Sequence, residues 1–442
     1  MTDASANNSA SGKSSLLVQD ARTRKRNAVE ARFKWYGITA IAIGCAFLIL
    51  LVTAIAFNGS RAFRQTFVNV PVTLDAAAIE AAEASMMKTS QYRKMIEAAL
   101  LIEVSEASIE TDMDAGKLGD MLSSSAPAQM RDFVLANPDR IGDTVSFDFL
   151  TSSRVDGYLK GRVTRESLAN DKNLDAAHLD LVDQMRDIGM VEKRFNIDFI
   201  IGSDASEERP EQAGMGVAIL GSLFMMFVVL FLSLPIGVAA SIYLEEFAPK
   251  SRWTDLIEVN ISNLAAVPSI VFGILGVAVF IQIGHLPKSA PLVGGLVLTL
   301  MTLPTIIIST RAALKAVPPS IREAALGVGA SKMQSVFHHV LPLAMPGILT
   351  GTIIGLAQAL GETAPLLLIG MVGFIATNYP TGPIDGFLSP NSAMPAQIYE
   401  WAKRADPAYY ERAWGGIIIL LVFLLAMNVI AVILRRRFER RW

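Results

Sequence analysis

The sequence predicts an α-helical polytopic membrane protein with six transmembrane helices and an inserted α+β extracytoplasmic domain. Three observations predict this fold class. Of the 442 residues, 52% are hydrophobic and only 18% are charged, with a mean hydropathy of +0.41. The charged residues gather in clusters, and the uncharged runs between them reach the ~20 residues needed to cross a bilayer. One stretch without such a run, residues 59–213, has the size of a folded domain.

Six apolar segments are long enough to span a membrane. They are Tyr36–Phe57, Gly214–Leu244, Val259–Gly284, Ser289–Thr310, a longer run from Leu341 to about Ala376, and Trp414–Leu434. Only a short loop containing HLPK separates the third from the fourth, which is typical of a tight helical hairpin. The fifth run is too long for one straight span and contains Pro365, so we expect it to be broken or tilted.

Basic residues at both ends of the chain predict that both termini are cytoplasmic, because lysine and arginine favour that side. Residues 1–35 are expected to form a disordered cytoplasmic tail, followed by a first transmembrane helix at 36–58 that acts as a signal anchor. The tail contains SGKSS, which resembles the end of a phosphate-binding loop. That loop requires a glycine where Asn7 stands, so we expect no ATP binding by this chain.

The extracytoplasmic domain, residues 59–213, carries 17 lysines and arginines against 27 aspartates and glutamates, a net charge of −10. Residues 75–105 have a helical pattern, whereas DTVSFDFL and RFNIDFIIG alternate as strands do. His178 stands alone, without a metal-ligand cluster, a nucleophile–base pair or a glycine-rich loop. We expect an interaction or spacer domain that binds no metal and no nucleic acid; its role is not indicated further.

A polar stretch, residues 320–342, follows the fourth apolar segment and predicts two short helices on the cytoplasmic side. Ser320 with Glu323, and Ser331 with Gln334, have the spacing of capping boxes, with Gly329 between the two helices. Each predicted helix has one apolar face, formed by Ile321, Ala324, Ala325 and Val328 in the first and by Met333, Val336, Phe337 and Val340 in the second. Pro342 is expected to end the second helix. Either the pair is an amphipathic hairpin on the lipid surface, or it is a rigid element that contacts a cytoplasmic partner.

The segment EAALGVGASKMQSVFHHVLP resembles the EAA motif of importer-type ABC transporter permeases. The matching residues are Glu323, Ala324, Ala325, Gly329, Leu341 and Pro342. Two further segments, ALGETAPLLLIG (359–370) and IYEWAK (398–403), resemble the PstA family of phosphate-importer permeases. The resemblance covers roughly residues 214–442 and does not extend over 59–213. It implies the importer-type permease fold, with 214–442 as a five-helix core and 320–342 as the unit that couples it to an ATPase.

The resemblance also implies the activity, the partners and the location. It implies a permease subunit of an ATP-driven inorganic phosphate importer in the bacterial inner membrane, which is not itself an enzyme. Its partners would be a second permease (PstC-like), a dimer of ATP-binding subunits (PstB-like) that uses ATP and Mg, and an extracytoplasmic phosphate-binding protein (PstS-like), besides membrane lipid. This chain would bind no cofactor. Two alternatives remain: a permease for sulfate, molybdate or another small solute, and a membrane sensor, although no cytoplasmic signalling domain is evident in the sequence.

Within the fifth apolar run, Gly347, Gly351 and Gly355 are spaced to let another helix approach closely. Gln358 and Glu362 continue the same stripe, and polar groups at membrane depth face protein or water. The carboxylate either holds helices together or belongs to the pathway as a gate, since it would repel phosphate unless protonated or paired. Further pathway candidates are Thr363, Ser309, Thr310 and Arg311.

Members of the family often carry arginine in place of Gln358 and an acidic residue in place of Arg311. The intramembrane charges are therefore rearranged in this sequence, and Arg311 could pair with Glu362. Adjacent His338 and His339 point in different directions on a helix and predict no metal site.

Overall fold

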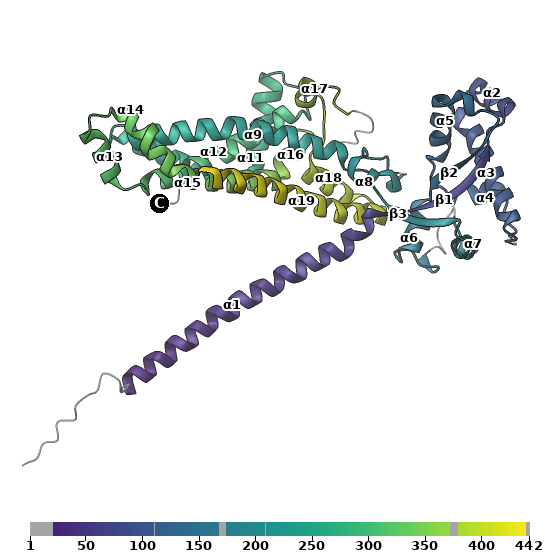
Figure 1. The fold of residues 1–442 in the computed structure, drawn as a ribbon, viewed down its shortest axis with the longest axis horizontal. Helices are drawn as coiled ribbons and strands as arrows, with labels where there is room; N and C mark the ends of the chain where they lie inside the picture. Colours follow the sequence, from purple (N-terminus) through teal and green to yellow (C-terminus); the bar gives the residue numbers. More distant parts are fainter. Residues whose placement is uncertain (1–20, 110, 168–173, 208, 372–378, 439–442) are drawn as a thin grey trace, which may run out of the picture. The chain divides into compact units, whose positions relative to one another are not determined.

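The computed structural model describes residues 21–109, 111–167, 174–207, 209–371 and 379–438 (Figure 1). It divides into two compact units, residues 1–56 and 57–442. Most of the predicted tail, including SGKSS, lies outside the described residues. Within them, α1 is one helix over Ala21–Gly59, so the expectation of disorder for residues 21–35 is wrong. That segment, ARTRKRNAVEARFKW, is rich in alanine, arginine and lysine, which favour helix.

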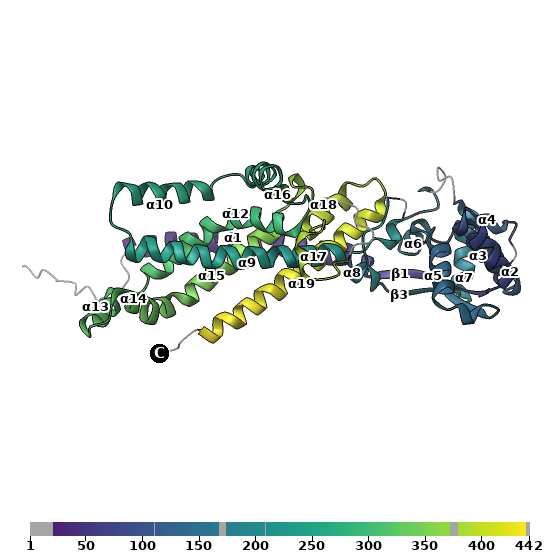
Figure 2. The same cartoon turned by 90° about the horizontal axis from the view of Figure 1, so that it is seen from above.

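Four long helices form the centre of the second unit. They are α9 (Gly216–Ile242, extended by a π-helical turn at Tyr243–Phe247), α12 (Pro291–Lys315), α15 (Leu341–Gly361) and α19 (Pro407–Phe438). Helix α12 packs against both α9 and α15, and α15 also packs against α19 (Figures 1 and 2). These helices correspond to four of the predicted spans. Their contacts bury mainly small and aliphatic side chains, as helix packing in a membrane requires.

The third predicted span is not one straight helix. Helix α10 (Arg252–Ala265) is followed by α11 (Ser269–Leu275) and a π-helical stretch (Gly276–Ile283), and the two parts meet at 102°. Pro268 lies at the bend, where it disfavours helical geometry for the preceding residue. Among the described residues, five helices are long and apolar enough to cross a membrane, or six if this bent pair is one span.

The fifth predicted span is broken, as expected. Helix α15 ends at Gly361, Glu362 is extended (φ −74°, ψ 130°), and α16 covers Ala364–Leu368. The end of the predicted segment, 372–376, lies outside the described residues. Two short helices, α17 (Pro383–Leu388) and α18 (Met394–Lys403), then lead into α19.

The predicted α+β region is built around a three-stranded antiparallel sheet with the order β2-β1-β3. The strands are β1 (Arg64–Thr73), β2 (Thr144–Leu150) and β3 (Val191–Phe195), and β1 follows a 3-10 turn at Ser60–Phe63. The helices are α2 (Ala76–Ala84), α3 (Lys88–Glu106), α4 (Ala115–Gly119), α5 (Ala126–Ala136), α6 (Ser153–Leu159) and α7 (Ala176–Asp187). Short 3-10 turns cover Pro138–Arg140 and Pro210–Gln212 (η4).

The prediction that RFNIDFIIG is a strand is only partly correct. The strand ends at Phe195, and Asp198–Ile201 forms the short helix α8. The side-chain oxygen of Asn196 accepts the backbone N–H of Phe199 at 3.0 Å, which favours the helical turn over continued extension.

The second unit contains separate hydrophobic cores. One core belongs to the α+β region and runs from Val68 to Val191. A second joins Phe199, Ala205 and Ala213 to the side chains of the membrane helices. These three residues therefore pack with the membrane part, although the sequence assigned them to the extracytoplasmic domain.

Candidate functional site

The helix pair predicted for residues 320–342 is present over residues 319–340, and we call it the coupling unit. It consists of α13 (Pro319–Gly327), α14 (Lys332–Ser335) and a π-helical turn (Val336–Val340) that leads directly into α15. Gly329 lies between them with φ +90°, a left-handed conformation that glycine adopts without strain. Within residues 57–442, the coupling unit and the β-sheet lie at opposite ends of the helical layer (Figures 1 and 2).

One of the two predicted capping boxes is formed. Ser331 Oγ accepts the N–H of Gln334 at 3.2 Å, and the Gln334 side chain accepts the N–H of Ser331 at 2.8 Å. The box predicted for Ser320 and Glu323 is wrong, because α13 begins at Pro319, two residues before the start at Ile321 that this box requires. A proline is favoured at the first helical position, where its missing N–H costs nothing.

The prediction that Pro342 ends the second helix is also wrong. The chain changes from a π-helical turn to α-helix at Leu341, so that Pro342 lies in the first turn of α15. The backbone hydrogen-bond pattern changes from π-helical to α-helical directly before Pro342, and such a local change accommodates a residue that has no N–H to donate. The coupling unit and α15 therefore form a continuous helical path from residue 332 to Gly361.

The coupling unit presents two different faces. Val336 and Val340 are buried against Ile242 and Leu314, at the ends of α9 and α12. On the other side, Glu323, Ala324, Leu326 and Met333 are exposed, and Val328 is 86% exposed. Val328 was predicted on the apolar face of the first helix; of that face Ala325 is buried, whereas Ala324 and Val328 are exposed. An exposed group of apolar side chains beside a carboxylate is typical of a protein-binding surface.

An ion pair holds the coupling unit to α9. The Arg322 guanidinium contacts the Glu246 carboxylate through Nη2 (2.7 Å) and Nε (3.1 Å). It also donates to the backbone carbonyls of Leu314 (2.9 Å) and Val317 (2.8 Å). Because the side chain of Glu246 is only 7% exposed, the pair and its hydrogen bonds fix α13 firmly.

Arg311, near the end of α12, is engaged by two carboxylates of other helices. Its Nη2 lies 2.5 Å from Glu258 of α10, and its Nε lies 3.4 Å from Glu245. Lys315 also approaches Glu245, at 3.5 Å. The expected pairing of Arg311 with Glu362 is therefore not formed.

The glycine stripe of α15 faces α12. A methyl group added to Gly347 would lie 2.7 Å from the Cβ of Ala313, and one added to Gly351 would overlap the hydroxyl of Ser309. At Gly355 the nearest atom, of Ile306, is 3.5 Å away, an ordinary contact distance. Helices α12 and α15 therefore approach each other most closely at Gly351, where Ser309 packs against the glycine in this conformation.

The other pathway candidates lie in different surroundings. Thr310 is fully buried, whereas Gln358 is exposed and both Glu362 and Thr363 are half-buried at the break after α15. Among the described residues, the Glu362 carboxylate has no hydrogen-bond or ion-pair partner, so no described side chain offsets its negative charge. The break thus brings together Gln358, Glu362 and Thr363, and it leaves Ser309, Thr310 and Arg311 elsewhere.

The sequence analysis missed the acidic partners Glu245, Glu246 and Glu258, together with Arg322. A signal was available for the first two, since a Glu-Glu pair directly after an apolar span requires cationic neighbours if it is to be buried. No sequence spacing indicated which cations these would be, because the partners are 53 to 76 residues away.

Comparison with known proteins places these features in a family. Residues 233–442 match the model for binding-protein-dependent transport system inner membrane components, and residues 20–169 match a domain of unknown function, DUF3333. The chain is 31% identical to the phosphate transport system permease protein PstA 1 of Mycobacterium tuberculosis over 52% of this chain and 74% of the relative. It is 31% identical to a probable phosphate transport system permease protein PstA of Methanocaldococcus jannaschii (49% and 74%) and 30% identical to PstA of Pasteurella multocida (50% and 76%).

A helical membrane core with an EAA segment defines an ABC importer permease, which has no ATPase site of its own. The chain belongs to the family of binding-protein-dependent transport system inner membrane components, and its relatives at about 30% identity include PstA phosphate permeases.

Proposed function

We propose that the chain is the transmembrane permease subunit of an ATP-driven inorganic phosphate importer in a bacterial inner membrane. It forms half of the translocation pathway, and a second, PstC-like permease forms the other half. The observation that carries the proposal is the 30–31% identity to three proteins named as phosphate permeases, over three quarters of their length. Both termini are cytoplasmic, in keeping with the basic residues after α19.

Energy comes from a separate, PstB-like ATPase dimer that uses ATP and Mg²⁺, and this chain binds no cofactor. The exposed face of the coupling unit, with Glu323, Ala324 and Val328, supplies a surface for that subunit. The buried face and the Arg322–Glu246 pair join the same unit to α9 and α12. A movement of the ATPase would thus reach the membrane helices through direct contacts. Phosphate would be delivered by a PstS-like binding protein.

The break after α15 is the part of the membrane interior best suited to the solute. Gln358 is exposed there, and Thr363 offers a hydroxyl donor beside Glu362. An ionised carboxylate repels a phosphate anion, so Glu362 acts as a gate that is protonated or paired when phosphate passes. Ser309 packs against α15 at Gly351, away from the break, and Thr310 is buried.

Uptake of labelled phosphate tests the proposal. The chain would be expressed with its partner subunits in cells that lack their own phosphate importer, and uptake would be measured with a tenfold excess of unlabelled phosphate, sulfate or molybdate. We expect competition by phosphate alone. Competition by sulfate or molybdate, but not by phosphate, would assign the permease to another oxyanion.

A further inference from the structure

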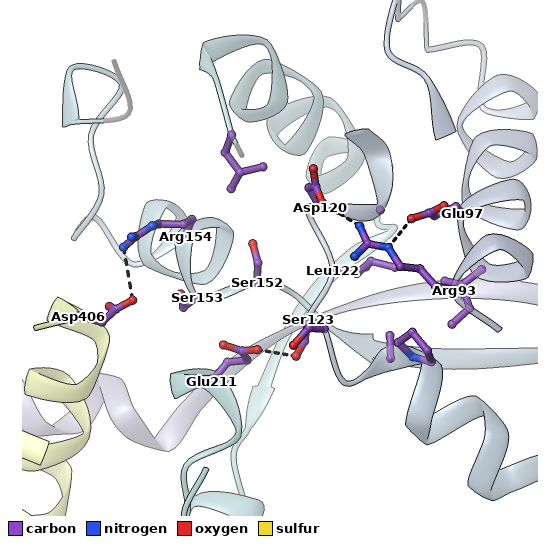
Figure 3. Close-up of a pocket in the computed structure, with 16 residues that line it drawn as sticks. Arg93, Glu97, Asp120, Leu122, Ser123, Ser152, Ser153, Arg154, Glu211 and Asp406 are labelled. Carbon is purple, nitrogen blue, oxygen red and sulfur yellow. Dashed lines mark hydrogen bonds and ion pairs between the residues drawn. The ribbon is translucent and has the colours of Figure 1, made fainter. Parts of the chain in front are cut away.

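A polar cavity of about 290 Å³ lies in the extracytoplasmic part of the second unit (Figure 3). Its walls come from α3, the turns before α5 and α6, η4 and the residue before α19. The labelled side chains in Figure 3 converge on the cavity from these separate elements. Residues of the coupling unit and of α15 do not line it.

The two arginines of the cavity already have carboxylate partners. Arg93 contacts Glu97 at 2.5 Å and Asp120 at 2.8 Å. Arg154 contacts Asp406 at 3.5 Å. Together with Glu211, the cavity has four acidic side chains against two basic ones. An oxyanion would have to displace a carboxylate from a guanidinium, whereas a cation would add to the carboxylates without loss of these pairs.

Glu211 is the buried acid of the cavity, with 7% of the residue exposed. One carboxylate oxygen accepts the hydroxyl of Ser123 at 2.5 Å. The nearby Arg412 donates to the Glu211 backbone carbonyl (2.9 Å), and the structure gives the carboxylate no ion pair among the described residues. Burial raises the pKa of Glu211, as expected for a carboxyl group without a cationic partner.

A second polar group in the cavity is also unsatisfied. The Ser152 hydroxyl is buried and has no hydrogen-bond partner in the described part of the chain. A buried hydroxyl without a partner is costly, and a bound solute would relieve that cost. Ile96, Leu122 and Leu174 add an apolar wall beside these polar groups.

We propose that this cavity binds a small organic ammonium compound. The ammonium group contacts the Glu211 carboxylate, the Ser152 hydroxyl bonds a polar atom of the solute, and the apolar wall contacts its alkyl chain. The net negative lining and the engagement of both arginines favour this class of ligand over an oxyanion. Because Asp406 directly precedes α19, the solute would contact both the extracytoplasmic domain and the start of a membrane helix. The proposal is independent of which solute the permease transports.

Titration calorimetry on the purified full-length chain tests the proposal, with putrescine and ethanolamine as probes. The control for putrescine is 1,4-butanediol, which has the same length and no charge, and orthophosphate tests the anion alternative. We expect saturable binding of at least one amine and none of the diol or of orthophosphate. Glu211→Gln should weaken amine binding about ten- to hundredfold, because a hydrogen bond to a charged group is lost. The matched control is Glu106→Gln, at an exposed position outside the cavity, which should bind as the wild type does.

Glutamine at position 211 can still accept a hydrogen bond from the Ser123 hydroxyl, so the Glu211→Gln variant is expected to fold. If it does not, Ser152→Ala, which removes a hydroxyl without a partner, should weaken binding about threefold to tenfold. The proposal is overturned if neither amine binds, if the diol binds as well as putrescine, if orthophosphate binds in place of the amines, or if the folded variants bind as the wild type does.

Discussion

Arg322 of α13 and Glu246 of the turn that ends α9 form a two-nitrogen ion pair, with Arg322 Nη2 2.7 Å and Nε 3.1 Å from Glu246 Oε1. The pair links two segments 76 residues apart. One segment belongs to the exposed coupling unit and the other to a helix that packs along α12. A displacement of the coupling unit must therefore move α9 or break a largely buried ion pair.

Replacing Arg322 with glutamine should weaken coupling more than folding. The substitution leaves Glu246 without its cation and removes donors to two backbone carbonyls. With about 1.5–3 kcal/mol for a hydrogen bond to a charged group, we expect ATP-driven uptake to fall about tenfold or more. Lysine should rescue only partly, because it lacks the guanidinium fork. Uptake by vesicles that contain the assembled transporter is the measurement. Arg252→Gln, at an exposed arginine outside the coupling unit, serves as the matched control. Unchanged uptake in Arg322→Gln would show that the pair does not transmit motion.

Gly351→Ala should disturb the packing of α15 on α12, whereas Gly355→Ala should not. A methyl group at Gly351 overlaps the Ser309 hydroxyl, while the nearest atom at Gly355 is 3.5 Å away. Overpacking costs about 1–3 kcal/mol, so Gly351→Ala should lower the thermal unfolding midpoint of the purified chain, with Gly355→Ala close to the wild type. Equal midpoints for the two variants would contradict the packing described.

The pH dependence of stability should report on Glu211. Burial raises its pKa above the ordinary value of 4.5, so the folded state binds more protons than the unfolded state. The contribution of Glu211 to the free energy of unfolding is fully present below pH 4.5, and it is lost as the pH rises through the raised pKa. In the absence of amines, Glu211→Gln should therefore be more stable than the wild type at pH 8 and should differ less at pH 5. Thermal unfolding at both values is the measurement, with Glu106→Gln as control. A wild type that gains stability relative to Glu211→Gln on going from pH 5 to pH 8 would refute the assignment.

The contact between α6 and α19, which we call the joint, should be destabilised when Lys160 is replaced. Its Nζ lies 2.7 Å from Asp156 and 2.8 Å from Glu411, and all three side chains are at most 7% exposed. Lys160→Ala leaves the buried Asp156 carboxylate without a cation, whereas Glu411 keeps Arg162 at 2.5 Å. Removing one partner of a buried ion pair costs about 3–5 kcal/mol. Lys403→Ala removes an exposed pair with Glu400 and should cost about 1 kcal/mol or less. Chemical denaturation of both variants separates these values. A similar, small loss in both would mean that the joint does not stabilise the chain.

Much of the fold could be predicted because membrane spans depend on local composition. Apolar runs of sufficient length predicted the helices, and the capping box at Ser331 and the left-handed Gly329 depend on residues close in sequence. The bend at Pro268 also had a local signal, which the length of the apolar run concealed. The start of α13 was missed by two residues, because Pro319 competed with the capping pattern of Ser320.

The site could be predicted only in part, because its ion pairs join distant segments. The helix pair with its EAA motif and the glycine stripe of α15 were visible in the sequence. The partners of Arg311 and Arg322 were not, since α9, α10 and α12 come together only on folding. Pro342 was misread because a π-helical turn before it shifts its position into the first turn of the next helix.

The central claim is that the exposed face of the coupling unit contacts a separate ATPase subunit in the cytoplasm. The most direct test places one cysteine at Val328, which is 86% exposed, in a chain whose only native cysteine, Cys45, is replaced by serine. A short bifunctional thiol reagent applied to the assembled transporter should then link this chain to an ATP-binding subunit. Val429→Cys, exposed on α19, should give no such product. The absence of a product with an ATP-binding subunit from position 328, or labelling of that position by an impermeant reagent from the extracytoplasmic side, would contradict the account.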